Sequence, residues 1–158
     1  MTSVDLPAVC GIAAEVHPDF PEDDSVFVER LALYPEGCHV LAGADGLAAY
    51  VVSHPWLALS CPPLNALLGS LPADAASYYI HDVALTPAVR GAGHATDIVA
   101  ALASHAATAG FAAMSLVAVN GSMGFWQRHG FASEDMPGLA AKLASYGDDA
   151  RFMVRALT

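Results

Sequence analysis

Apolar residues recur along this chain at helical spacing in some segments and as short continuous runs in others, which predicts a mixture of helices and strands. The expected helices cover residues 6–16, 26–34, 93–109, 122–129 and 139–146. Their ends carry recognisable signals. Asp23, Asp24 and Ser25 can cap the second helix, and Gly110 follows the third.

The expected strands cover residues 38–42, 47–53, 78–85, 113–119, a short segment near residue 132, and residues 151–156. The Gly-Ala-Asp-Gly segment at residues 43–46 predicts a hairpin between the first two strands. The strands at 78–85 and 113–119 are connected through a helix, so we expect them to be parallel with a right-handed crossover. The pattern as a whole predicts an α/β fold in which one sheet carries helices on both faces.

One long connection interrupts this pattern. Residues 55–76 are rich in proline and leucine and include one expected helical piece near residues 64–71. The segment is longer than most connections in a compact domain, and such loops are often binding elements.

Composition limits the possible classes of protein. The 158 residues, 55% of them hydrophobic, are enough for one domain (1–158) with a sizeable core. No apolar run reaches the roughly 18 residues of a membrane span, and residues 1–5 lack the pattern of a secretion signal. Cys10, Cys38 and Cys61 have no metal-ligand spacing, so we expect reduced thiols, no metal and a cytoplasmic location.

The formal charge of −10 disfavours nucleic-acid binding, which needs a basic face. It is compatible with a cationic partner, although an acidic solvated surface is the simpler explanation. The high apolar fraction is compatible with a homodimer, but no segment specifies its surface.

A turn rich in glycine joins the strand at 78–85 to the helix at 93–109. Pro87 ends the strand, and Gly91 and Gly93 allow backbone conformations that other residues avoid. The first amides of the following helix have no partner within the helix and lie at the positive end of its dipole. This arrangement predicts a pyrophosphate site. His94-Ala95-Thr96 does not fit the Gly-Lys-Ser/Thr pattern of phosphate-loop nucleoside triphosphatases. The acidic residue expected downstream of a dinucleotide-binding fingerprint is also absent.

The turn resembles a signature of the GNAT family of N-acetyltransferases. Arg90-x-x-Gly93-x-Ala95 is similar to the Arg/Gln-x-x-Gly-x-Gly/Ala motif with which that family binds the pyrophosphate of acetyl-CoA. The strand before the turn, the segment 116–120 that ends in Asn120, and the segment 125–131 that ends in Gly-Phe follow the family's spacing. The resemblance implies a mixed, splayed sheet whose first strand is here short or missing.

The resemblance also implies acetyl-CoA as co-substrate and assigns residues to it. The expected pyrophosphate residues are Arg90, Gly91, Ala92, Gly93, His94, Ala95 and Thr96. The main chain of Val83, Ala84 and Leu85 is expected to pair with the pantetheine arm where the sheet splays. Asn120 is expected to bind the pantetheine, although a helix N-cap is the alternative.

Two histidines are candidates for the general base that takes a proton from the acceptor amine. His81 lies on the strand expected to carry the thioester, and His54 follows the strand whose end faces the acceptor. A hydrogen-bonded structural role is the alternative for both. Strand geometry predicts that His81 and Asp82 point to opposite faces. The acidic segment that contains Asp19, Glu22, Asp23 and Asp24 can attract a cationic amine or merely cap a helix.

Trp126 departs from the family pattern, which usually has a tyrosine there to protonate the leaving thiolate. An indole N–H donates hydrogen bonds but is too weak an acid for that role. We therefore expect Trp126 to pack beside the cofactor. The predicted function is acetyl transfer from acetyl-CoA to an amine of a small molecule or peptide. The alternative is a catalytically weak module that binds acyl-CoA and serves in regulation.

Overall fold

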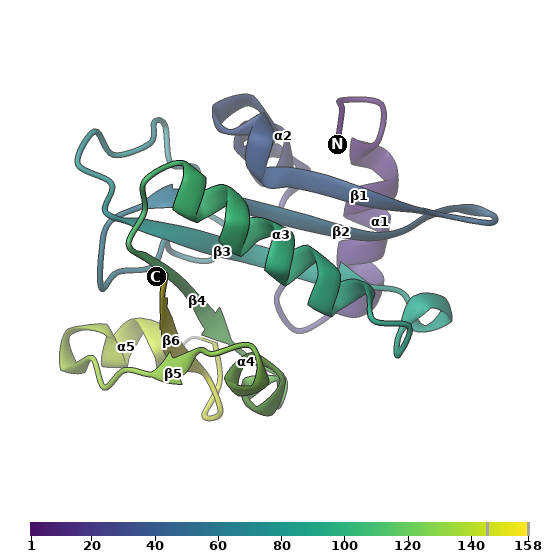
Figure 1. The fold of residues 1–158 in the computed structure, drawn as a ribbon. Coiled ribbons are helices and arrows are strands. Elements are labelled where there is room, and N and C mark those ends of the chain that lie inside the picture. The colour runs from purple at the N-terminus through teal and green to yellow at the C-terminus, as the bar shows by residue number, and fades with distance from the viewer. Residues whose placement is uncertain (145, 158) are drawn as a thin grey trace.

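The computed structural model describes residues 1–144 and 146–157. Its centre is a mixed sheet of six strands in the order β1-β2-β3-β4-β6-β5 (Figure 1). The strands are β1 (Cys38–Gly43), β2 (Gly46–Trp56), β3 (Ser77–Leu85), β4 (Ala113–Ala118), β5 (Ala132–Ser133) and β6 (Arg151–Ala156). The helices are α1 (Leu6–Val16), α2 (Asp24–Leu33), α3 (His94–Thr108), α4 (Met123–Arg128) and α5 (Ala140–Ala144).

The sheet consists of two antiparallel parts joined by one short parallel contact. β1, β2 and β3 pair antiparallel in chain order, and β4, β6 and β5 form the second antiparallel part. β3 and β4 pair in parallel only at Tyr78 with Met114 and at Tyr79 with Ser115. Beyond those pairs the two strands separate, which confirms the splayed sheet.

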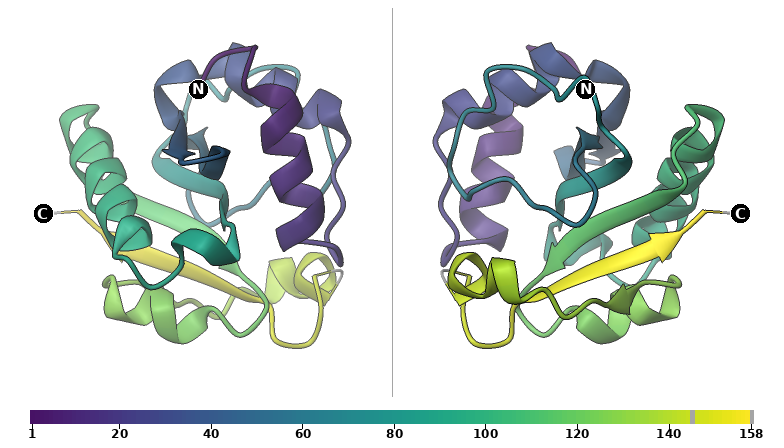
Figure 2. Two further views of the ribbon diagram at one scale, coloured as in Figure 1. Left: turned by 90° about the vertical axis from the view of Figure 1, so that its right-hand side faces the viewer. Right: turned by 90° about the vertical axis from the view of Figure 1, so that its left-hand side faces the viewer.

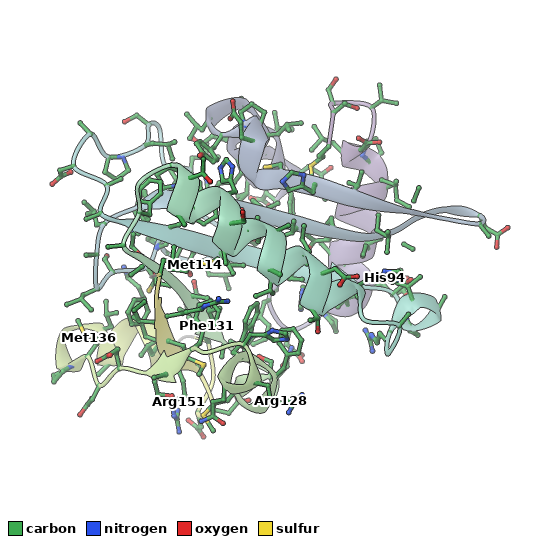
Figure 3. The ribbon with its side chains drawn as sticks, viewed as in Figure 1. His94, Met114, Arg128, Phe131, Met136 and Arg151 are labelled. Carbon is green, nitrogen blue, oxygen red and sulfur yellow. The ribbon has the colours of Figure 1, made fainter. Side chains whose placement is uncertain are left out.

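Helices cover both faces of the sheet, as the sequence predicts. α1 and α3 lie on opposite sides (Figure 2). α1 packs against β2 and β3 through a cluster that includes Val9, Ile12 and Val52. α3 and α4 cover the other face through a larger cluster, in which Met114 of β4 and Phe131 are buried (Figure 3). The apolar residues of each helix recur on one side, so each helix buries that side against the sheet.

Several boundaries differ from the expectation. The helix expected near residues 64–71 does not form, because that segment adopts irregular turns with Asn65 and Gly69 at positive φ. β2 continues through His54 to Trp56 and does not end before them. Residues 1–5 form no strand, and α1 begins directly at Leu6. The last helix is shorter than residues 139–146, and residue 145 lies outside the described residues.

No helix among the described residues has the length and apolar character needed to cross a lipid bilayer.

His54 is a core residue in this fold. It is only 1% exposed, and its ring contacts the rings of Trp56, Tyr79 and His81 at centroid distances of 5.6, 5.7 and 6.1 Å. Its Nδ1 lies 2.9 Å from the carbonyl oxygen of Pro55, and its Nε2 has no partner. Burial lowers the pKa of His54 from 6.5 to about 3, because the charged imidazolium is poorly solvated there.

Burial of His54 predicts a specific loss of stability in acid. Between pH 6.5 and about 3 the ring stays neutral in the folded protein but binds a proton in the unfolded chain, so stability falls as pH falls. We expect the free energy of unfolding of the wild type to decrease relative to His54→Phe by up to about 1.4 kcal/mol per pH unit in that range. Urea unfolding of both proteins from pH 7 to pH 3.5 measures this difference. Parallel stability curves would contradict the buried neutral state of His54.

Candidate functional site

A cleft of about 670 Å³ lies where β3 and β4 separate. One end is formed by the turn after β3, the start of α3 and the start of α4. The other end is formed by the segment between α1 and α2, the connection after β2, and Tyr146. Because the two strands part without a third strand between them, main-chain groups of β3 are available to a ligand on that side.

The turn after β3 has the geometry expected of an anion site. Gly91 and Gly93 have φ values of 79° and 92°, which favour glycine, and an added Cβ would meet no atom within 4 Å at either position. The space in front of both residues is therefore open to a ligand. The first i→i−4 bond of α3 runs from the amide of Asp97 to the carbonyl of Gly93, so the amides of residues 94–96 precede it.

The predicted pyrophosphate residues gather at this end of the cleft. All of them except Ala92 line it: Arg90, Gly91, Gly93, His94, Ala95 and Thr96. Arg90 is oriented by a hydrogen bond of 3.0 Å from its Nε to the carbonyl oxygen of Leu85. His94 is the first residue of α3 and lies beside the turn in Figure 3. Arg90 is the one Lys or Arg among the described residues that line the cleft.

β3 presents main-chain groups to the cleft at alternate residues. The amide of Thr86 donates to the carbonyl of Ala48 on β2, and in an antiparallel ladder this direction alternates along the strand. The amides of Val83 and Leu85 therefore face away from β2, toward the space that β4 leaves. Val83 and Leu85 line the cleft, whereas the Ala84 side chain is buried in the core beneath α1.

A β-bulge changes the direction of the side chains in the middle of β3. Asp82 opposes Val52 and Ile80 opposes Ser53, so His81 has no partner on β2. The extra residue breaks the alternation of the strand, and both His81 and Asp82 point toward the segment between α1 and α2. The expectation that their side chains face opposite sides of the sheet is therefore wrong.

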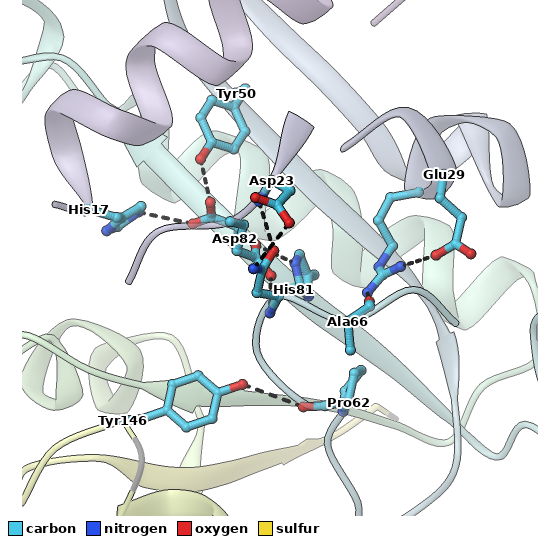
Figure 4. Close-up of polar contacts among 12 residues, drawn as sticks. His17, Asp23, Glu29, Tyr50, Pro62, Ala66, His81, Asp82 and Tyr146 are labelled. Atoms are coloured by element: carbon cyan, nitrogen blue, oxygen red, sulfur yellow. Dashed lines mark hydrogen bonds and ion pairs between the residues drawn. The ribbon is translucent and has the colours of Figure 1, made fainter. Parts of the chain in front are cut away.

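The bulge produces two adjacent histidine–carboxylate pairs. His81 Nε2 lies 2.9 Å from Glu22 Oε2, and both side chains are 6% exposed. His17 Nε2 lies 2.9 Å from Asp82 Oδ1, and the hydroxyl of Tyr50 donates to the other oxygen of Asp82. Figure 4 shows His17, Tyr50, Asp82 and His81 gathered at this end of the cleft.

Two of these groups have shifted pKa values. Burial by itself would raise the pKa of Glu22, but the hydrogen bonds from His81 and from the Asn65 amide outweigh it, so the pKa of Glu22 is lowered and the group is ionised at neutral pH. Burial would lower the pKa of His17, but Asp82 outweighs it and the net shift is upward. Glu22 is thus a charged carboxylate inside the cleft.

The remaining predicted residues divide between the cleft and the core. Asn120 lines the cleft with a φ of 54°, and Ser122, two residues later, is the N-cap of α4. Trp126 lines the cleft, is 8% exposed, and stacks edge-on against Phe125 and Phe131. His54 does not line the cleft and is enclosed by the core.

Phe20 and Tyr146 line the cleft although sequence reasoning assigned them no role, and His17 lines it although the sequence favoured it less than His81 and His54 as a base. His17-Pro18 marks the end of a helix in the sequence, and Phe20 and Tyr146 belong to no motif. No cluster of three or more potential metal ligands occurs in residues 1–144 and 146–157.

Comparison with known proteins agrees with this architecture. The model of the acetyltransferase (GNAT) family matches residues 7–131. No curated protein matches the chain in sequence.

Solved structures share the fold at low sequence identity. The GNAT-like decarboxylase GphF, in complex with isobutyryl-CoA, is similar with a TM-score of 0.84 at 17% identity, covering 100% of this chain and 97% of that one. The loading GNATL domain of CurA from Lyngbya majuscula gives 0.80 at 12% identity, covering 98% and 94%. The ribosomal-protein-S18-alanine N-acetyltransferase from Escherichia coli gives 0.68 at 15% identity, covering 100% and 91%.

The family model spans most of the chain, including the splayed strands, the glycine turn and the segment that ends in Phe131. The chain therefore belongs to the GNAT family of acetyltransferases.

Proposed function

We propose that this protein transfers an acetyl group from acetyl-CoA to an amine. The observation that carries the proposal is the chemistry of the cleft end opposite the glycine turn. Two histidine–carboxylate pairs line that end, and no described Lys or Arg lines it. Carboxylates attract an ammonium ion, and a neutral imidazole can take its proton.

The opposite end of the cleft has the features of a CoA site. The open turn at Gly91 and Gly93, the first amides of α3 and the guanidinium of Arg90 would bind the pyrophosphate. The outward amides of Val83 and Leu85 would pair with the pantetheine arm, and Asn120 and Trp126 would lie along its other side. The isobutyryl-CoA complex of the GNAT-like decarboxylase supports an acyl-CoA in a fold of this kind.

Transfer would take place in a ternary complex. His81, held by Glu22, accepts the proton of the amine, and the amine nitrogen then attacks the thioester carbonyl. An amide of β3 near Val83 stabilises the oxyanion. The C–S bond breaks and CoA leaves as a thiolate, which is a tolerable leaving group because thiols titrate near 8.5. Positioning the two substrates in line supplies much of the acceleration.

Decarboxylation of an acyl-CoA whose acyl chain carries a free carboxylate is a second candidate function. The observation that favours it is the similarity over the full chain to the GNAT-like decarboxylase, together with Trp126 at the position where a tyrosine acid is expected. The charged Glu22 argues against it, because it would repel the substrate carboxylate.

The first test is release of CoA thiol from acetyl-CoA in the presence of a panel of amines. We expect turnover that depends on the amine, and we expect His81→Gln to lower kcat by about 10²- to 10⁴-fold, the usual contribution of a general base. Acetyl-CoA affinity should stay unchanged in that variant. His39→Gln, on the edge strand β1, is the matched control and should keep full activity.

Other outcomes of this assay separate the alternatives. Acetyl-CoA binding without CoA release for any amine would favour the regulatory module. Release of CO₂ from malonyl-CoA without an amine would favour the decarboxylase.

A second prediction concerns the pyrophosphate site. Gly93→Glu places a carboxylate against the phosphates, and we expect it to weaken acetyl-CoA binding by at least about 100-fold. Gly93→Asn tolerates the left-handed backbone without adding charge and should lose much less affinity. Gly11→Glu, exposed on α1, controls for the charge alone. Calorimetric titration measures the affinities, and unchanged binding in a folded Gly93→Glu protein would refute this site.

A third prediction concerns Trp126. Trp126→Ala opens a hole in the wall of the cleft and should mainly weaken acyl-CoA binding, with a loss of stability of about 3–5 kcal/mol. Trp126→Tyr and Trp126→Phe differ only in the hydroxyl acid. If no side chain acts as acid here, their pH–rate profiles measured by CoA release should agree. Full acyl-CoA affinity in Trp126→Ala would show that the residue does not contact the cofactor.

A further inference from the structure

The end of the cleft opposite the glycine turn, which we call the acceptor end, has a largely apolar wall in addition to its charged pairs. Five side chains form that wall: Val16, Phe20, Leu64, Tyr79 and Tyr146. The rings of Phe20 and Tyr146 face each other with centroids 6.2 Å apart and planes inclined by 30°. Such a surface binds an apolar or flat body and gains most when that body is aromatic.

Direct contacts connect the three segments that surround this end. Phe20, from the segment between α1 and α2, packs on Tyr146, which follows α5. The hydroxyl of Tyr146 donates to the carbonyl of Pro62, in the connection after β2, at 3.4 Å. The same connection meets the first segment at Asn65, whose amide donates to Glu22 at 3.0 Å and whose side-chain oxygen accepts from the amide of Asp23 at 2.7 Å.

These contacts disfavour a polypeptide acceptor. A peptide that presents its N-terminus to the thioester must lead the rest of its chain out between two of the surrounding segments. Here Phe20, Tyr146 and Asn65 join each segment to a neighbour, so an extended chain would have to break those contacts. Figure 4 shows one of them, between Tyr146 and Pro62. A small molecule that ends inside the cleft needs no such opening.

The charges at this end narrow the class of acceptor further. An amino acid would bring its carboxylate close to the ionised Glu22 and to a second acidic side chain, that of Asp82. A diamine would need a partner for its second ammonium. Among the described residues that line the cleft, only Glu22 and Asp82 are carboxylates, and both lie around the first ammonium. The second charge would therefore be buried against apolar walls at a cost.

We propose that the acceptor is a small monoamine with an apolar, preferably aromatic body and no carboxylate. Its ammonium lies between the two histidine–carboxylate pairs, and its body lies against Phe20 and Tyr146. This inference rests on the proposed acetyl transfer and names the substrate class of the same site.

The test compares amines that differ by one group. We expect kcat/KM for 2-phenylethylamine to exceed that for phenylalanine, which adds only a carboxylate, by at least about 100-fold, and that for 1,4-diaminobutane by at least about 10-fold. A peptide with a free N-terminal phenylalanine should be the poorest acceptor. Phe20→Ala should lower kcat/KM for 2-phenylethylamine about 10-fold and leave acetyl-CoA affinity unchanged. Leu67→Ala, in the same region but 61% exposed, is the control.

Binding of the same amines to the protein–CoA complex, measured by calorimetry, separates the two hypotheses. If 2-phenylethylamine binds at least about 100-fold more tightly than phenylalanine but no acetyl group is transferred, the acceptor class is supported and the proposed function is overturned. If phenylalanine, the peptide or the diamine is acetylated as efficiently as 2-phenylethylamine, the function stands and the acceptor class is overturned. Equal turnover by Phe20→Ala and wild type would also overturn it.

Discussion

The short parallel contact between β3 and β4 is the constraint on which the rest of the structure depends. Pairing at only two positions holds the two halves of the sheet together, and the separation beyond them creates the cleft. Unpaired main-chain groups of a central strand are costly unless water or a ligand satisfies them. The separation therefore provides a row of polar groups for an extended ligand, while the helices keep the apolar parts of both halves covered.

The two ends of the cleft use different physics. At the glycine turn, main-chain groups form the surface that faces the cleft. Gly91 and Gly93 have positive φ and leave open space in front of them, and the start of α3 supplies free amides and the positive end of a dipole. At the other end, charged and titratable side chains form that surface. The bulge in β3 turns His81 and Asp82 to the same side, where Glu22 and His17 meet them. One extra residue in a strand thus brings Asp82, and with it the pair with His17, to the same side as His81.

The acceptor end depends on the connection after β2 as much as on the regular elements. That connection has no helix, yet it is fixed through Asn65 and Pro62 to its neighbours and through the carbonyl of Cys61 to Lys142 on α5. Several of its backbone polar groups form hydrogen bonds with side chains of neighbouring segments, whereas the backbone groups of a helix bond to one another. The proposed choice of acceptor follows from these contacts, which set the size and closure of the cleft end.

The sequence alone determined the order of the elements and predicted the glycine turn as a pyrophosphate site. Both are local: apolar spacing sets each helix and strand, and the Arg90-x-x-Gly93-x-Ala95 turn needs only its own glycines and the helix after it. The splay was predicted through family resemblance and is confirmed by the pairing of β3 with β4.

Tertiary structure alone decided the acceptor end. His54 was the second sequence candidate for the general base, after His81, but the fold buries it in the core. The bulge depends on the register of β3 against β2, which the sequence of β3 alone does not set. The partners of His81 and Asp82 come from residues 17–22, about sixty positions away in sequence. No pattern in those residues links them to β3.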